Sequence, residues 1–349
     1  MARIKEYWLQ LENHLWDVCP WGANRLAGEP LARRPDGAFR PASREVLLIR
    51  RYTATWAAPD DRPINPWDLT ELDPATTPGT LPGAVITAKV ADEIVVHFRN
   101  MDRRTGFPDN ARVHSLHPHG VQGAAAHNGA FPLSPPDPAQ GNRRGDRVAP
   151  GESFTYRWSC PQRAAAGTWL YHDAGPEGSQ NTAAGAFGVL VIQAPGEQEP
   201  DPPAGPLRRA GDTTQRFATV PAPPRRADYL LAFHELPGVG LCLNGRAGLG
   251  NTPLLVTGIE TRMTLRCVNA TTNPLTVYVA GHRWERGGGN YTDVELLPPG
   301  GGATLSILSG SAEGGGGPGE WLITGRSGSQ SVSGSLITTR GGAVDLVSG

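Results

Sequence analysis

Both halves of this sequence carry the same ordered series of short β-type segments, which restricts the fold more than any other feature. In the first half, GDRVAPGESFTYRW is followed by GTWLYHDAG and GAFGVLVI. In the second half, DVELLPPGGGATLSI, GEWLITGRSG and VSGSLITT follow in the same order. A repeat of about 120 residues or more, built from such segments, indicates two copies of one β-sandwich. We therefore predict an all-β fold with two Greek-key β-sandwich domains.

The length and composition agree with two domains rich in turns. The chain has 349 residues, of which 45 are Gly and 33 are Pro, and this composition favours short strands and turns over long helices. The tract after the first set of strands is polar and rich in Pro and Arg, so it is unsuited to a core. We predict a first domain at 1–195, a linker at 196–226 and a second domain at 227–349.

The charge and the cysteines exclude several classes of protein. With 32 Lys and Arg against 33 Asp and Glu, the net charge of −1 gives no electrostatic case for nucleic acid or an anionic membrane. No apolar run reaches the roughly 20 residues of a membrane span. The N-terminus lacks the apolar stretch of a secretory signal, so we expect a cytoplasmic protein. The four cysteines are scattered without a C-x-x-C motif, and we expect them to be free and buried.

Histidines gather in the heptapeptide HSLHPHG, which holds three of the nine in the chain. His117 and His119 are two positions apart, so on a strand their side chains share a face, and His172 ends another strand that could converge with them. Three imidazoles suit copper or zinc. Hydrogen-bonded histidines without a metal are the alternative. His114 has the opposite strand parity and His127 lies in a loop, which makes both weaker ligand candidates.

The ordered motifs resemble the multicopper oxidase and copper nitrite reductase superfamily, which is built from tandem cupredoxin domains. HPHG (117–120) is similar to its H-x-H-G motif, and GTWLYHDA (167–174) is similar to its second histidine motif. LNGRAGLGNTPLLVTGIETRMTLRCVN (243–269) is similar to the entry of a strand pair in its second domain. The resemblance covers residues 40–340 and implies cupredoxin-like domains, a copper cofactor and oxidoreductase activity.

The sequence departs from the superfamily at most of its copper ligands. Other residues stand where the resemblance places ligands or the residues of ligand motifs: Ala174, Leu275, Tyr278, Ala280, Thr324, Gly325 and Arg326. Asp173 occupies the position at which nitrite reductases carry their cysteine. A blue copper site needs two imidazoles and a thiolate, so neither domain is expected to form one.

These observations predict a copper oxidoreductase with a reduced, non-blue, mononuclear site that acts on a small organic substrate, for example in specialised metabolism. We expect His119 and His172 to ligate the metal with His117 as the third ligand. Asp173 is the catalytic candidate, as a general acid or base or as a group that orients a ligand, although a solvated aspartate is the alternative. A non-redox enzyme such as a cyclase or isomerase, or a protein that only binds copper or a small molecule, stays open. The resemblance also implies a homotrimer.

Overall fold

The computed structural model of the protein describes residues 3–24, 29–35, 37, 40, 43–71, 77–203, 217–220 and 222–345. Within these ranges the chain is nearly all β, as predicted, and its one α-helix is the six-residue α1 (Gly178–Ala183). The described residues also form five short 3-10 helices: η1 (Ala54–Trp56), η2 (Asp109–Arg112), η3 (Ala125–His127), η4 (Pro138–Gln140) and η5 (Arg163–Ala165).

The chain forms two compact units that do not follow the predicted domain boundaries. Unit 1 comprises Met1–Leu15, Glu45–Arg62 and Asp73–Glu197, and unit 2 comprises Trp16–Arg44, Pro63–Leu72 and Gln198–Gly349. The end of unit 1 lies close to the predicted boundary at residue 195. The two early segments of unit 2 were predicted to belong to the first domain, and the structure assigns them to the second.

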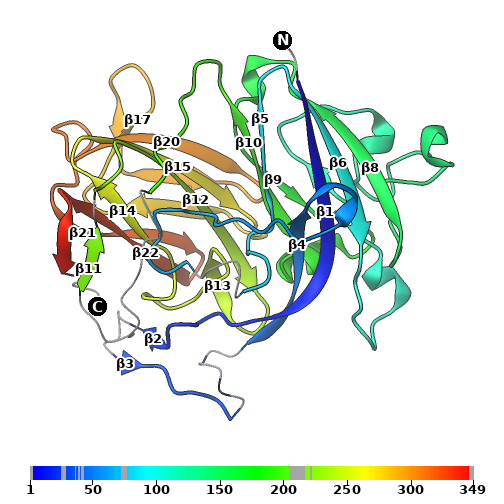
Figure 1. Ribbon diagram of the computed structural model, residues 1–349, viewed down its shortest axis with the longest axis horizontal. Coiled ribbons are helices and arrows are strands. Elements are labelled where there is room, and N and C mark those ends of the chain that lie inside the picture. Colours follow the sequence, from blue (N-terminus) through cyan, green and yellow to red (C-terminus); the bar gives the residue numbers. More distant parts are fainter. Residues whose placement is uncertain are drawn as a thin grey trace. The chain divides into compact units, whose positions relative to one another are not determined.

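Unit 1 is a sandwich of two four-stranded sheets. The first sheet has the order β4-β1-β6-β8, with β4 (Arg44–Tyr52), β1 (Ile4–Trp16), β6 (Glu93–Asn100) and β8 (Ser153–Ser159), as Figure 1 shows. The second has the order β5-β10-β9-β7, with β5 (Val85–Lys89), β10 (Phe187–Gln193), β9 (Gly167–His172) and β7 (His117–Pro118). Strand β1 pairs parallel with β6, and β5 pairs parallel with β10. The other pairs with an assigned register are antiparallel.

Unit 2 repeats this arrangement of strands. Its first sheet is β13-β12-β15-β20, with β13 (Gly240–Leu243), β12 (Arg226–Leu236), β15 (Thr261–Asn269) and β20 (Gly302–Ser309). Its second sheet is β14-β22-β21-β16-β19, with β14 (Leu254–Gly258), β22 (Gln330–Thr339), β21 (Gly319–Ser327), β16 (Leu275–Val279) and β19 (Val294–Leu297). The parallel pairs recur as β12 with β15 and β14 with β22. The shared topology agrees with the repeat seen in the sequence.

Three two-stranded ladders complete the described strands: β2 (Ala23–Asn24) with β3 (Glu29–Pro30), β17 (Trp284–Glu285) with β18 (Tyr291–Thr292), and β11 (Phe217–Val220) with β23 (Gly342–Asp345). The last of these concerns the predicted linker at 196–226. Residues 204–216 and 221 of that stretch lie outside the described residues. The part at 217–220 forms a strand, so it is not a simple connector.

Each unit buries its own core, and the core explains the corrected boundary. In unit 1, alternate residues of β8 point inward, so Phe154, Tyr156 and Trp158 are buried while the residues between them are more exposed. In unit 2, Trp67 lies in the same buried cluster as Tyr229, and its indole nitrogen donates to the carbonyl of Asp201 at 2.7 Å. Burial of Trp67 explains why Pro63–Leu72 belongs to unit 2. The periodicity of the sequence does not show that Trp67 packs in the core of unit 2.

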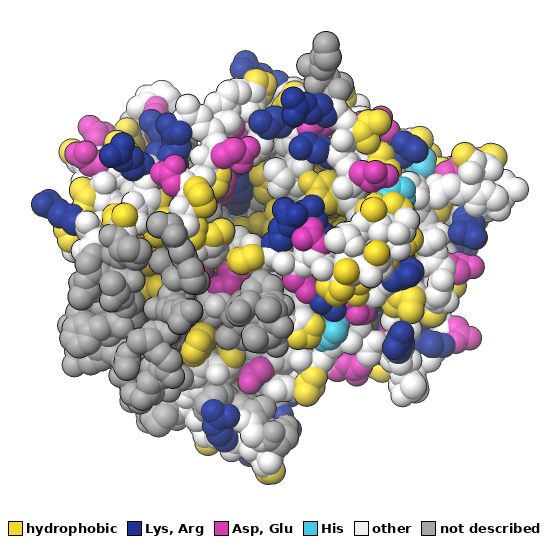
Figure 2. Space-filling model, in the orientation of Figure 1, with side chains coloured by type: hydrophobic (Ala, Val, Ile, Leu, Met, Phe, Trp, Pro, Cys, Tyr) yellow, Lys and Arg dark blue, Asp and Glu magenta, His cyan; other side chains and the backbone are white. Residues whose placement is uncertain are grey.

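The surface carries charges of both signs. Figure 2 shows basic and acidic side chains interspersed on the face drawn, in keeping with the net charge of −1. Among the described residues, no helix is long and apolar enough to cross a membrane.

Candidate metal site

Strands β7 and β9 bring together the three histidines that the sequence singled out. In the antiparallel register His117 lies opposite His172, and the backbone N–H of His119 donates to the carbonyl of Leu170 on β9 at 2.9 Å. The ring centroids of His117 and His119 are 5.4 Å apart, those of His117 and His172 are 5.6 Å apart, and those of His119 and His172 are 5.2 Å apart. The expected convergence of these side chains is therefore present, and we call these three residues the histidine triad.

Backbone carbonyls fix the tautomers of two rings in the histidine triad. The Nδ1 atom of His117 is 2.8 Å from the carbonyl of Asn128, and the Nδ1 atom of His172 is 2.8 Å from the carbonyl of Asp173. A carbonyl can only accept, so each Nδ1 carries the hydrogen and donates it. Each Nε2 then presents its lone pair, which is the arrangement that carbonyl partners give to metal-binding histidines.

The ring spacing of the histidine triad is close to that of imidazoles bound to one metal ion. The Nε2 atoms of His119 and His172 are 3.2 Å apart. Two nitrogens bound to one ion at about 2.0 Å with a tetrahedral angle would lie about 3.3 Å apart, and the ring centroids of three such imidazoles would lie about 5.2–5.5 Å apart. Among the described residues, no group of three or more His, Cys, Asp and Glu side chains is arranged to hold a metal ion as it stands. The histidine triad therefore has the ring spacing of a metal site but not its complete ligand arrangement.

Burial keeps one member of the histidine triad ready to bind a cation. Desolvation, followed by smaller effects that include the charges of His119 and His117, lowers the pKa of His172 to about 4. The ring is therefore neutral at pH 7, as a metal ligand must be. All three residues remain partly exposed to solvent.

A close contact between Gly120 and Trp169 supports the loop that begins after β7 and carries His119. Gly120 has φ +73°, and a Cβ at this position would lie 2.1 Å from the ring of Trp169. The Trp169 indole N–H donates to the carbonyl of Ala165 at 2.8 Å, which fixes the ring. Only glycine satisfies both the left-handed backbone and this approach, which explains the glycine of HPHG.

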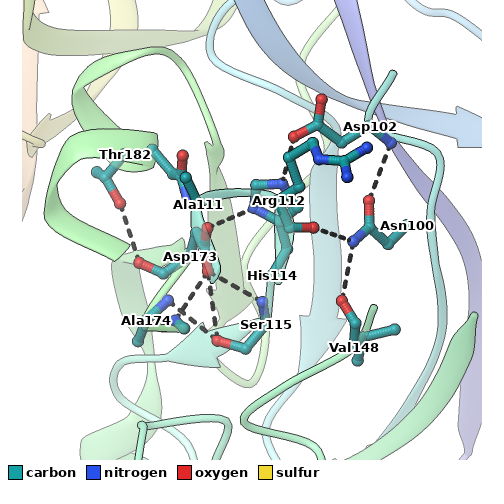
Figure 3. Close-up of polar contacts among 12 residues, drawn as sticks. Asn100, Asp102, Ala111, Arg112, His114, Ser115, Val148, Asp173, Ala174 and Thr182 are labelled. Carbon is teal, nitrogen blue, oxygen red and sulfur yellow. Dashed lines mark hydrogen bonds and ion pairs between the residues drawn. The ribbon is translucent and has the colours of Figure 1, made fainter. Parts of the chain in front are cut away.

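His114 does not belong to the histidine triad, contrary to its selection as a ligand candidate. Its ring is fully buried between two carboxylates, with Nδ1 2.6 Å from Asp173 Oδ2 and Nε2 3.0 Å from Asp102 Oδ2, as Figure 3 shows. Both nitrogens donate to these acceptors, so no lone pair is left for a metal. Burial alone would lower the pKa of His114, but the negative charges of Asp173 and Asp102 and their hydrogen bonds raise it. The opposite strand parity of His114 was the signal for this inward position.

Asp173 is also buried, which argues against the predicted role as a general acid or base. One of its oxygens accepts the N–H groups of Ser115 and Gly175, each at 2.9 Å, and the other accepts from His114. Burial alone would raise the pKa of Asp173, but the charge of His114 and these hydrogen bonds lower it. The carboxylate is therefore ionised, fully engaged and not in contact with solvent. The orienting role remains, because its carbonyl holds the ring of His172.

His127 lies apart from the histidine triad. Its ring packs against Phe154 with centroids 5.8 Å apart, and its Nε2 is 3.8 Å from a carboxylate oxygen of Asp137. The carbonyl of His127 accepts from the indole of Trp158 at 3.1 Å. These contacts give His127 a structural position and no part in the candidate site.

Sequence reasoning missed the second carboxylate on His114 and the guanidinium that balances it. Arg104 donates to Asp102 through Nε at 2.9 Å, and its Nη2 is 2.8 Å from the same carboxylate oxygen. Burial alone would raise the pKa of Asp102, but its hydrogen bonds with His114 and Arg104 and the charge of Arg104 hold it well below its usual range. The spacing of Asp102 and Arg104 in a loop gave no pattern by which this contact could be predicted.

Unit 2 contains the same pair of strands without the imidazoles. In the register of β16 with β21, Tyr278 lies opposite Thr324, as His117 lies opposite His172 in unit 1. The N–H of Ala280 donates to the carbonyl of Leu322 at 2.9 Å, which matches the bond made by His119. Tyr278, Ala280 and Thr324 thus stand at the positions of His117, His119 and His172, respectively.

His282 is the nearest histidine in the sequence to these unit 2 positions. It is buried, and its Nδ1 donates to the carbonyl of Ala280 at 2.9 Å. Its ring contacts Trp321 with centroids 5.7 Å apart. His282 therefore occupies a structural position.

Comparisons with known proteins show what this chain is similar to. Residues 63–197 match the family model described as multicopper oxidase. Ferroxidase HEPHL1 of Mus musculus is 30% identical over 201 residues, which are 54% of this chain and 16% of that relative. A multicopper oxidase crystal structure aligns with a TM-score of 0.56 and 14% identity over 96% of this chain and 89% of its own. Copper nitrite reductase from Nitrosomonas europaea aligns with a TM-score of 0.55 and 14% identity over 96% of this chain and 94% of its own.

These findings agree with the resemblance of the motifs to the multicopper oxidase and copper nitrite reductase superfamily. Its two units have the cupredoxin-like fold of that superfamily. The matched family model and the nitrite reductase are both named for copper. The chain spans only a small part of the curated relative described above, so the activity of that protein is not transferred to it.

Proposed function

We infer that the chain binds one copper ion through His117, His119 and His172 and serves as a non-blue copper oxidoreductase. The observation that carries this proposal is the 3.2 Å separation of the His119 and His172 Nε2 atoms. The third ring lies at a similar distance from both, and carbonyl groups hold two of the three rings as Nε2 ligands. Imidazole ligands suit copper, and the superfamily favours it over zinc.

The protein groups around the site favour a non-blue centre. The one cysteine of unit 1 is Cys160, and burial, with a smaller effect from Asp92, raises its pKa to about 11. Cys160 is therefore a thiol at pH 7, and it lies in the hydrophobic core. A blue site requires a thiolate ligand, which these residues do not supply.

Three protein ligands leave room for a further molecule. A bound copper ion would supply one-electron redox chemistry and an open coordination position. The partly exposed rings give a small organic substrate access to that position. The carboxylate of Asp173 is fully buried, so it is not placed to meet a substrate. In this proposal Asp173 acts through its backbone carbonyl, which holds the ring of His172 in place.

Metal analysis followed by dioxygen uptake tests the proposal. Protein purified without a histidine tag should contain about one copper per chain, and it should consume dioxygen with small organic reductants only when copper is present. The matched control is His282→Ala, which should keep both properties. Copper content no higher than that of a His119→Ala, His172→Ala variant would refute the proposal and favour a non-redox use of the fold.

We also propose a homotrimer, on the resemblance to two-domain members of the superfamily alone. Light scattering over a wide range of concentrations tests this assembly. A monomer throughout that range would refute it.

A further inference from the structure

A cluster of charged side chains lies buried behind the histidine triad. His114 is enclosed by Asp102 and Asp173, and Arg104 balances the second negative charge of the group. The side chains of His114, Asp102 and Asp173 have no exposed surface. Both ring nitrogens of His114 donate to carboxylates, so the ring is an imidazolium and the four charges sum to zero. We call His114, Asp102, Asp173 and Arg104 the charged clamp.

The charged clamp joins the two chain segments that carry the histidine triad. The carboxylate of Asp173, the residue directly after His172, accepts a hydrogen bond from the N–H of Ser115. Ser115 in turn lies two residues before His117. The N–H of Ala174 donates to Ser115 Oγ at 3.1 Å and closes a second link between the same segments (Figure 3). The carbonyl of Asp173 also holds His172 Nδ1 at 2.8 Å. The position of the Asp173 backbone therefore controls the direction of the His172 lone pair.

Unit 2 shows that the fold itself does not require these charges. Strand register places Leu275 at the position of His114 and Gly325 at the position of Asp173. Leu275 is fully buried, and Gly325 leaves its space to the ring of Phe233, which a Cβ would approach to 2.4 Å. The same strand pair therefore forms around apolar side chains. Burying charges costs free energy even when they are paired, so their presence in unit 1 alone indicates a purpose other than folding.

We propose that the charged clamp is a positioning element that sets the spacing and the tautomer of the histidine triad for its metal. The inference rests on the proposed function for the identity of the ligands. His114 acts through Asp173 and touches neither metal nor substrate, so it is a positioning residue. Groups that orient metal-binding histidines from outside the ligand set typically contribute about 10–100-fold to metal affinity.

The test gives unit 1 the residues of unit 2, in the double variant His114→Leu, Asp173→Gly. The first readout needs no metal: long-range ¹H–¹⁵N NMR of the histidine rings in the metal-free protein. The native protein should show His172 as the single Nδ1–H tautomer, and the variant should show a mixture of tautomers. The second readout is Cu(II) affinity, which should fall by about 10–100-fold. The control is His282→Leu, which should change neither readout.

The possible results separate this inference from the proposed function. An unchanged His172 tautomer in the variant, with copper affinity within twofold of the native value, would overturn the inference. Failure of the native protein to bind copper would refute the proposed function, and the NMR result would then decide the inference alone. Should the double variant not fold, Asp102→Asn gives the same readouts with a smaller expected change, and no change in either would overturn the inference.

Discussion

The β7–β9 pair of unit 1 and the β16–β21 pair of unit 2 share their backbone and differ in their chemistry. Gly120 lies against Trp169 in one unit, and Gly281 lies against Trp321 in the other, both with positive φ. Each tryptophan donates its indole N–H to the carbonyl four residues earlier, at 2.8 Å in unit 1 and 2.9 Å in unit 2. The glycine and tryptophan contacts therefore specify the strand pair, whereas the imidazoles and the charged clamp specify the candidate site.

Removing two members of the histidine triad should have the largest effect. The double variant His119→Ala, His172→Ala loses both nitrogens of the 3.2 Å pair, so a single imidazole remains. Copper affinity should fall by more than about a thousandfold, because each lost ligand removes a coordinate bond. Equilibrium dialysis against a competing chelator measures it. Retention of one tightly bound copper would mean that the metal site lies elsewhere.

Placing the histidine triad in unit 2 tests whether the matching strand pair there can also form a copper site. The triple variant Tyr278→His, Ala280→His, Thr324→His places imidazoles on the matching backbone positions. Copper content should rise from about one to about two per chain, because the strand register already matches. The new site should bind about tenfold or more weakly than the native one, since unit 2 lacks the charged clamp. A grafted site as tight as the native site would contradict the positioning role.

The two glycines separate the shared scaffold from the site. Gly120→Ala places a methyl group 2.1 Å from the ring of Trp169, and Gly281→Ala places one 2.3 Å from the ring of Trp321. Both positions have a positive φ. Each should lower the free energy of unfolding by about 3 kcal/mol through backbone strain and overpacking. Urea denaturation measures both losses. Only Gly120→Ala should also weaken copper binding, and an equal effect of Gly281→Ala on copper would break the distinction between the units.

Buried histidines should make the units respond differently to acid. Burial lowers the pKa of His234 in unit 2 to about 3, below the unfolded value of about 6.5. Its contribution to stability is complete above about pH 6.5 and is lost as the pH falls, by about 2 kcal/mol at pH 5. The pKa of His114 is raised, so its contribution is complete below about pH 6.5 and is lost as the pH rises through the folded value.

The variant His234→Leu tests this difference at matched volume. Its change in unfolding free energy between pH 7 and pH 5 should be smaller than that of the native protein by about 2 kcal/mol. Urea denaturation at the two pH values measures it. An identical pH dependence in the variant and the native protein would show that His234 is not held neutral in the fold.

The fold and the histidine triad could be predicted from sequence because both depend on local patterns. Strand alternation and the internal repeat predicted the two sandwiches, and the spacing of His117 and His119 predicted that their side chains share one face. The domain boundary could not be predicted, since Trp67 enters the core of unit 2 from a segment without strand periodicity. The charged clamp was also missed, because His114 and Asp173 are 59 positions apart and meet only through tertiary packing.

X-ray absorption on the copper-loaded protein tests the central claim most directly. We predict one copper per chain with three imidazole nitrogens at about 2.0 Å, no sulfur ligand and no second copper nearby. The His119→Ala, His172→Ala variant should lose this spectrum, and His282→Ala should keep it. A sulfur ligand, a copper–copper distance in the spectrum, or an unchanged spectrum in the double variant would contradict a single site at the histidine triad.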